Sequence, residues 1–191
     1  MLITELNLAL PAWLRQQLST PPASLPDTEQ RMAWVLQLAR QNIRAGTGGP
    51  FAAAVFDAEG QLIAAGVNLV LSSGLSCAHA EMVALSLAER QLQHFDLSGR
   101  QLQLVSSAEP CVMCLGAVHW AGVSELVYAA CDEDVRAIGF DEGYKPQDWA
   151  AALRGHGIRV VPDVLREEGR AVLSEYRTHG GAIYNAGMEA P

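Results

Sequence analysis

Four residues in two short stretches of this chain have the types and spacing needed to bind a metal and move protons. His79 precedes Glu81 by two residues, and Cys111 and Cys114 lie three residues apart directly behind Pro110. One imidazole and two thiolates form a three-ligand set for a catalytic zinc ion, which keeps its fourth position for water. We therefore predict that His79, Cys111 and Cys114 bind Zn²⁺ and that Glu81 stays free to act as an acid and base.

Each of the two stretches stands at the start of a predicted helix. Residues 82–88 follow Glu81 without glycine or proline, and Pro110 suits a helix start because its missing N–H is not needed there. Cys111 and Cys114 then share one side of the first turn. His79 and Glu81 point toward one site only if both lie at a helix end. The pattern thus predicts two helix N-termini facing one metal, where the thiolate form is also favoured.

Other interpretations of the cysteines explain less of the pattern. A redox pair at Cys111 and Cys114 gives no role to His79 or Glu81. A structural zinc site needs a fourth protein ligand, and neither Cys77 nor Cys131 has a partner at ligand spacing.

Composition points to a globular protein, and its acidic charge favours a small, uncharged substrate. The chain has 191 residues, half of them hydrophobic, and a formal charge of −8. It shows no cluster of lysine and arginine, so we expect no binding to a nucleic-acid backbone. It also shows no signal peptide and no apolar run long enough to span a bilayer, so we expect a cytoplasmic protein without a membrane partner.

The elements that must position these residues alternate along the chain. After a hairpin with a turn at 57–60, strands and helices follow in turn, which favours a central mixed sheet with helices on both faces. The helix between the last two strands implies that those strands are parallel. We predict strands over 51–56, 62–71, 102–106, 125–129 and 158–161, and helices over 11–18, 28–45, 80–93, 112–118, 132–138, 148–154 and 164–178.

The chain resembles the cytidine-deaminase-like superfamily and, within it, the small zinc-dependent guanine deaminases of bacteria. His-x-Glu with Pro-Cys-x-x-Cys is the signature of the superfamily. The resemblance covers most of the chain, and it is carried by residues 48–56, 107–117, 138–143 and 183–185. It implies a three-layer α/β/α sandwich with a central five-stranded mixed sheet, and a homodimer. It also implies one deaminase domain over 1–191, with an N-terminal extension at 1–27 and a tail at 180–191 that closes an active site.

The resemblance also assigns roles to residues outside the zinc motifs. It implies that Glu142 is a second catalytic acid, with Asp141 as the alternative if the match is off by one. Asn68 matches an asparagine that hydrogen-bonds the purine, and Phe51 and Trp120 match aromatic side chains that line or stack on the base. The expected substrate contacts are Asn68, Phe51, Ala80, Trp120, Phe140, Asp141 and Tyr184.

Deamination of guanine to xanthine and ammonia, a step of purine catabolism, is the function that this resemblance implies. A tRNA adenosine deaminase shares the zinc motifs but needs a basic RNA-binding surface. Cytosine or a triazine is another possible substrate. A deaminase fold retained only as a binding module has no need for an acid such as Glu81 beside an open metal position.

Overall fold

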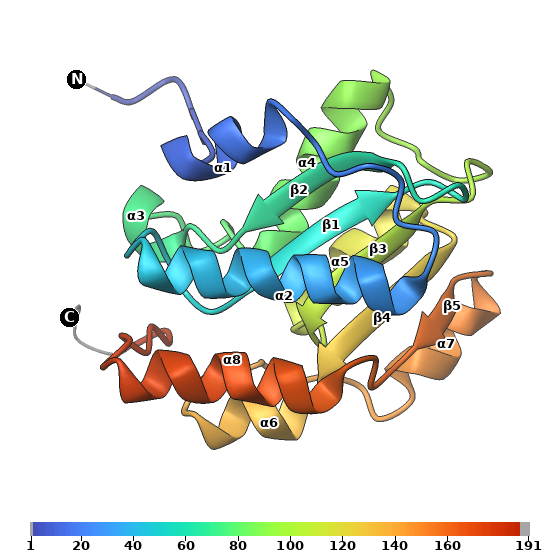
Figure 1. Cartoon of the computed structure of the whole chain (residues 1–191). Coiled ribbons are helices and arrows are strands. Elements are labelled where there is room, and N and C mark those ends of the chain that lie inside the picture. Colours follow the sequence, from blue (N-terminus) through green and yellow to red (C-terminus); the bar gives the residue numbers. More distant parts are fainter. Residues whose placement is uncertain (1, 188–191) are drawn as a thin grey trace.

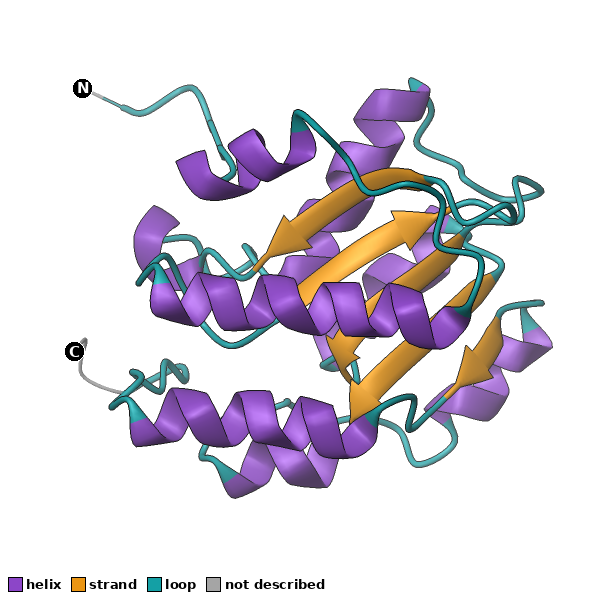
Figure 2. Cartoon of the chain, in the orientation of Figure 1, coloured by secondary structure: helices purple, strands orange, loops and turns teal. Residues whose placement is uncertain are grey.

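Five strands form one mixed sheet at the centre of the molecule (Figure 2), and the computed structural model describes residues 2–187 around it. The strand order is β2-β1-β3-β4-β5. β1 pairs antiparallel with both β2 and β3, whereas β3, β4 and β5 run parallel, so the mixed sheet and its parallel end are as predicted. The strands are β1 (Ala52–Phe56), β2 (Leu62–Val67), β3 (Gln103–Ala108), β4 (Glu125–Ala130) and β5 (Arg159–Val161).

Helices cover both faces of the sheet, which makes the three-layer α/β/α arrangement (Figure 1). The helices α1, α2 and α8 pack on one face, and α4, α5 and α7 pack on the other. The helices are α1 (Ala12–Leu18), α2 (Thr28–Arg44), α3 (Val70–Ser73), α4 (Ala80–Leu92), α5 (Val112–Ala121), α6 (Asp132–Ala137), α7 (Trp149–Gly155) and α8 (Arg166–Thr178). None of them is long and apolar enough to cross a membrane.

Strand β1 is buried on both sides, and its side chains point alternately into the two layers of the core. Ala53 and Val55 point toward α4 and α5, whereas Ala52, Ala54 and Phe56 point toward α2. This is the two-residue period of a strand. All five side chains are fully buried, so this alanine-rich stretch is a central strand, as predicted.

The sheet and helix α4 approach each other closely at Gly66 of β2. A Cβ at this position would lie 2.5 Å from the carbonyl oxygen of Ala80 and 2.6 Å from the amide nitrogen of Ala84. Only glycine allows the first turn of α4 to lie this near the sheet. The start of that helix carries His79 and Glu81, so the close approach also places the site.

The second strand ends four residues earlier than predicted. We expected it to reach residue 71, but β2 ends at Val67. The side-chain oxygen of Asn68 accepts a hydrogen bond from the amide of Val70 at 3.2 Å, and the chain turns into the short helix α3. Such a local bond from asparagine competes with strand pairing.

The two ends of the chain differ in how they join the fold. In the predicted N-terminal extension, Leu14 of α1 is fully buried against the α2 face, and residue 1 lies outside the described residues. The last helix begins at Arg166 instead of residue 164. The part of the predicted tail at 188–191 also lies outside the described residues.

Candidate metal centre and active-site cavity

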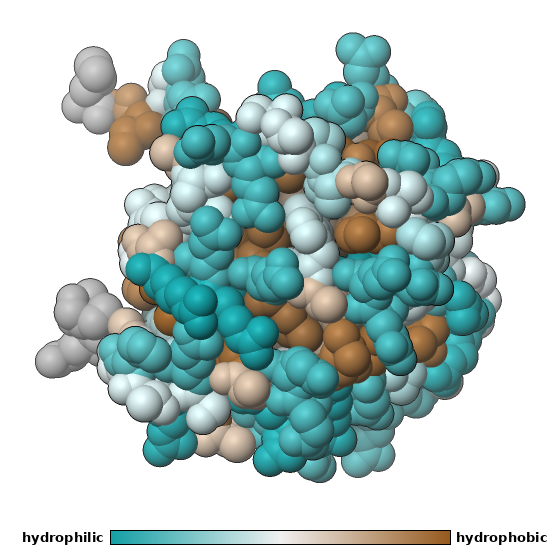
Figure 3. All heavy atoms as spheres, in the orientation of Figure 1, coloured by the Kyte–Doolittle hydropathy of each residue, from teal (hydrophilic) through white to brown (hydrophobic). Residues whose placement is uncertain are grey.

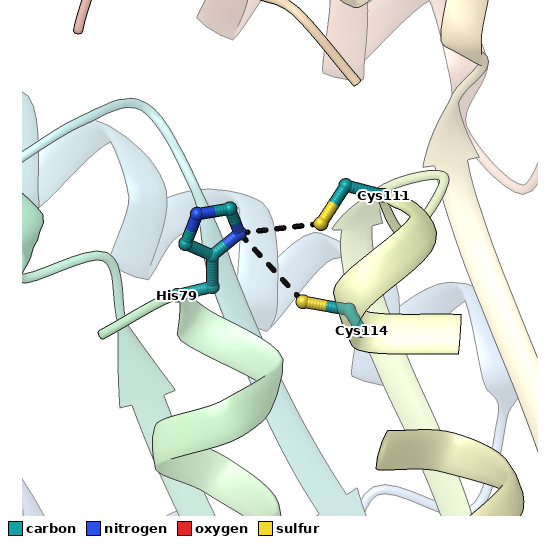
Figure 4. Close-up of side chains that lie close together, drawn as sticks. All are labelled: His79, Cys111 and Cys114. Atoms are coloured by element: carbon teal, nitrogen blue, oxygen red, sulfur yellow. Dashed lines mark hydrogen bonds between the residues drawn. The ribbon is translucent and has the colours of Figure 1, made fainter. Parts of the chain in front are cut away.

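Two helix N-termini meet at one point below the carboxyl end of β3. His79 is the N-cap of α4, Cys111 is the N-cap of α5, and Cys114 lies in the first turn of α5. Figure 4 shows the three side chains pointing toward one another from the two helices. They form the one group of at least three metal-binding side chains that lies close together among residues 2–187.

The spacing of the three ligand atoms fits a tetrahedral zinc ion. The Nδ1 atom of His79 lies 3.5 Å from Sγ of Cys111 and 3.7 Å from Sγ of Cys114. Zinc bonds of about 2.3 Å to sulfur and about 2.1 Å to nitrogen place tetrahedral ligands about 3.6 Å apart. The ligand set predicted from the two motifs therefore comes together with the required geometry.

The two cysteines form a coupled pair in which Cys111 carries the charge. A hydrogen bond from Cys114 lowers the pKa of Cys111, and a second bond to His79 acts in the same direction. The same hydrogen bond raises the pKa of Cys114, and burial raises it further. A metal cation favours the thiolate form of both groups, so zinc binding releases protons from this site.

Glu81 lies beside the ligands and is itself no ligand of the group. Its side chain is 6% exposed, and its two oxygens accept hydrogen bonds from Ser106 Oγ at 3.2 Å and Cys114 Sγ at 3.5 Å. Burial raises the pKa of this carboxyl group, and the negative charge of Cys111 raises it further. A buried carboxyl next to a metal site suits proton transfer.

The loop that follows α6 gives different surroundings to Asp141 and Glu142, the two candidates for the second acid. Glu142 is 8% exposed and lines the cavity over the metal ligands, and burial raises its pKa to about 8. Asp141 touches the rim of the same cavity, but its side chain is 66% exposed and pairs with Arg136. The backbone oxygen of Glu142 accepts a hydrogen bond from the first amide of α5, at Val112.

Most of the expected substrate contacts lie around this one cavity. Phe51 and Phe140 meet edge to face with ring centroids 5.2 Å apart, and Tyr184 meets Phe140 in the same way at 4.9 Å. Asn68 is buried at the end of β2, where Asn42 donates a hydrogen bond to its carbonyl oxygen. The cavity is lined by Phe51, Asn68, His79, Glu81, Ala108, Glu109, Cys111, Phe140, Asp141, Glu142, Tyr184 and Asn185.

Two residues of this wall have unused hydrogen-bonding capacity. The side-chain oxygen of Asn68 is taken by Val70, which leaves its amide nitrogen to donate. The hydroxyl of Tyr184 is buried and has no hydrogen-bond partner among the described residues. A buried hydroxyl without a partner is costly unless a ligand or water satisfies it.

Trp120 and Ala80 are not brought to the cavity. Trp120 lies in the last turn of α5 and is 82% exposed. Within one chain it therefore does not reach the cavity, where it was expected to stack on a base. Its position, six residues after Cys114, turns it away from the helix start that carries the metal ligands. Ala80 is fully buried in the core at the start of α4 and is absent from the cavity wall.

Sequence reasoning overlooked several residues of the site. Ser106 contacts Glu81 from β3, and Glu109 lines the cavity while it pairs with Lys145 at 2.8 Å. Asn185 lines the cavity from the tail. The sequence did give a hint for two of them, because Glu109 adjoins Pro110 of the zinc motif and Asn185 adjoins Tyr184. The local sequence does not show where their side chains point.

This fold and site define a zinc-dependent deaminase. Residues 26–130 match the family model of the cytidine and deoxycytidylate deaminase zinc-binding region, and the chain belongs to that family. The predicted superfamily, fold and zinc cofactor are thereby confirmed.

Guanine deaminases are prominent among the similar proteins. The solved guanine deaminase from Nitrosomonas europaea is 48% identical with a TM-score of 0.88, over 93% of this chain and 99% of that one. A structure solved with 2,6-diaminopurine is 50% identical, with a TM-score of 0.87, over 94% and 96% of the two chains. The guanine deaminase of Bacillus subtilis is 40% identical over 56% of this chain and 67% of its own length. A tRNA-specific adenosine deaminase from Haemophilus influenzae is 31% identical over 78% of this chain and 82% of its own.

Proposed function

We propose that this chain catalyses the hydrolytic deamination of guanine to xanthine and ammonia. The observation that carries the proposal is the pair of buried carboxyl groups, Glu81 and Glu142, that line one cavity over the zinc ligands. The similarity to guanine deaminases across most of the chain supports the same substrate.

The cavity wall offers the groups that a flat, polar base requires. Phe51, Phe140 and Tyr184 supply apolar ring surface, and the amide of Asn68 and the hydroxyl of Tyr184 supply hydrogen bonds. A pocket with much apolar surface and a few placed polar groups fixes both the plane and the edge of such a ligand. The purine base is therefore proposed to lie with its amino-bearing carbon, C2, toward the metal ligands.

The two carboxyl groups divide the proton transfers. When bound, zinc supplies the nucleophilic water that attacks C2. Glu81 takes a proton from that water and delivers it to the ring nitrogen beside C2. Glu142 protonates the departing amine and regains a proton from the hydroxyl group on C2 as the new carbonyl forms. Burial favours the protonated form of Glu142 that this role needs. One proton of water ends on the ring and the other leaves with ammonia, so guanine and water give xanthine and ammonia.

A free base suits the site better than a nucleic acid. The formal charge of −8 opposes the approach of a phosphate backbone. Tyr184 and Asn185 of the tail line the cavity of their own chain, which narrows the space open to a polynucleotide. We therefore propose that neither tRNA nor DNA is a substrate.

A substrate panel tests the proposal. Ammonia release by the zinc-loaded protein is measured with guanine, guanosine, adenine, cytosine and an aminated triazine, with Glu81→Gln as the control for contaminating activity. We expect the highest kcat/KM with guanine and a much lower value with guanosine. A higher kcat/KM with any other member of the panel, or no ammonia from guanine, would contradict the proposal.

We further propose a homodimer that acts in purine catabolism in the cytoplasm. Helix α5 supports the homodimer, because Val112 and Trp120 are exposed on it at 43% and 82%. The opposite face, formed by α2 and α8, is mostly hydrophilic, with apolar atoms mainly between the two helices (Figure 3). An exposed apolar strip on one helix suits contact with a second copy.

A further inference from the structure

The loop that carries Glu142 has no regular secondary structure, so side chains from elsewhere set its path. Residues 139–146 lie between α6 and α7 and pair with no strand. Arg136 donates a hydrogen bond to the carbonyl oxygen of Gly143 at 2.8 Å. The backbone amide of Val112 donates one to the carbonyl oxygen of Glu142 at 3.2 Å. These bonds hold the second half of the loop.

Asn185 holds the first half of the loop through the oxygen and the nitrogen of its side-chain amide. Its Oδ1 accepts a hydrogen bond from the backbone amide of Asp141 at 2.9 Å, and its Nδ2 donates to the carbonyl oxygen of Gly139 at 2.9 Å. The two bonds bracket Phe140 and lie directly before Glu142. Asparagine is suited to this task because it both donates and accepts, whereas aspartate only accepts.

The tail that brings Asn185 to the loop is itself anchored. Tyr176 of α8 donates a hydrogen bond from its hydroxyl to the carbonyl oxygen of Ala182 at 2.6 Å. Ile183 lies beside Gly139, where a Cβ built on the glycine would be 3.6 Å from the Ile183 side chain, and the φ of +109° favours glycine there. The ring of Tyr184 contacts Phe140. The side chain of Asn185 therefore reaches the loop from a fixed backbone.

We propose that Asn185 is a positioning residue that sets Glu142 in the cavity and makes its placement depend on the docked tail. The tail then has two tasks, because Tyr184 and Asn185 line the cavity and Asn185 also completes the arrangement of the second acid. This proposal rests on the proposed function for its kinetic test, and it has a second test that needs no substrate. Asn185 acts through the backbone on either side of Phe140 and not on the reacting atoms.

The kinetic test compares Asn185→Ala and Asn185→Asp with Thr178→Ala. Thr178 is an exposed residue of α8 whose hydroxyl bonds only within its own helix, so it is a matched control close to the tail. We expect both Asn185 variants to keep full zinc content and to lose about tenfold or more in kcat, the scale of one or two lost hydrogen bonds. KM should change less than kcat, and Thr178→Ala should behave like the wild type.

A double-mutant cycle separates positioning from a general loss of structure. In a Glu142→Gln background, Asn185→Ala should cause little further loss of kcat, because the group that it positions is already gone. Independent effects that multiply in the double variant would overturn the proposal. So would an Asn185→Ala enzyme with wild-type kcat.

Hydrogen exchange provides the test that does not depend on the substrate. Asn185→Ala removes the acceptor for the Asp141 amide, so peptides covering residues 139–146 should exchange faster, while peptides from α4 and β3 should not change. Unchanged exchange in this loop would overturn the proposal even in an active enzyme. A wild-type protein that does not deaminate guanine but shows the exchange effect would contradict the proposed function alone.

Discussion

At the level of single residues, neighbouring acids have different roles because of their surroundings. Asp141 and Glu142 are adjacent, yet one is mostly solvated and paired with Arg136, whereas the other is buried over the metal ligands. Desolvation raises the pKa of Glu142 to about 8 and so keeps a proton on it near neutral pH. This contrast favours Glu142 as the second acid.

Exchange of each acid for its amide tests this assignment. Glu142→Gln removes a proton donor without changing size, so we expect kcat on guanine to fall by about 10²-fold or more. Asp141→Asn should be much milder, because it loses only a surface ion pair. Both variants should retain zinc, as measured by metal analysis. Equal losses in the two variants would contradict the assignment.

A second prediction concerns the metal ligands. Cys114→Ala removes one of three protein ligands, so we expect loss of both bound zinc and activity. Cys77→Ala is the matched control, because Cys77 is an exposed cysteine outside the metal group. Zinc content by elemental analysis checks both variants. A Cys114→Ala protein with one zinc per chain would show that the ligand set is wrong.

At the level of elements, the site depends on close contacts between segments that are distant along the chain. Helix α4 lies against the sheet at Gly66, and the tail lies against Gly49, which precedes β1. A Cβ at Gly49 would lie 2.0 Å from the hydroxyl oxygen of Tyr184. The missing side chain of Gly49 therefore makes the space that this hydroxyl occupies in the cavity wall.

This contact gives a prediction for the tail. Gly49→Ala should displace Tyr184 and with it the tail. We expect kcat/KM on guanine to fall by about tenfold or more, because small displacements of residues that position a substrate strongly reduce the reaction rate. Gly155→Ala is the control, since nothing lies within 4 Å of a Cβ there at the end of α7. Steady-state kinetics of both variants provide the measurement. A Gly49→Ala enzyme with normal kcat/KM would mean that Tyr184 does not contribute to binding.

At the level of the whole molecule, the distribution of charged and apolar side chains on the surface influences which partners can bind. The α2 and α8 face is mostly hydrophilic, and the exposed apolar residues of α5 lie on the opposite side of the sheet. The negative charge of the chain disfavours nucleic acid at long range. A small base and a second copy of the chain are the partners that we propose for this protein.

The proposed dimer is tested in solution. We expect a homodimer in sedimentation experiments and a shift toward monomer in Trp120→Glu, because a charge is then placed in an apolar contact. Gln37→Glu adds the same charge on the exposed side of α2 and should leave the mass unchanged. A wild-type monomer, or a Trp120→Glu variant with an unchanged mass, would exclude α5 as the interface.

The zinc ligands, the start of each metal-binding helix and the mixed sheet could be predicted from the sequence because local rules govern them. Cys111 and Cys114 share a helix turn whatever the rest of the chain does, and the strand and helix periods are visible within short windows. The end of β2 was the exception, since the bond from Asn68 to Val70 competes with a strand pattern that continues beyond it.

Only the tertiary structure showed that Ser106, Glu109 and Asn185 share the site with the residues that the family resemblance implied. The bonds from Asn185 reach across 44 and 46 positions to Asp141 and Gly139, and no local pattern encodes such a pairing. Burial separates Glu142 from Asp141, and the direction of α5 takes Trp120 to the surface. These outcomes depend on how whole elements pack, because a side chain's exposure and partners are set by neighbours that are distant along the chain.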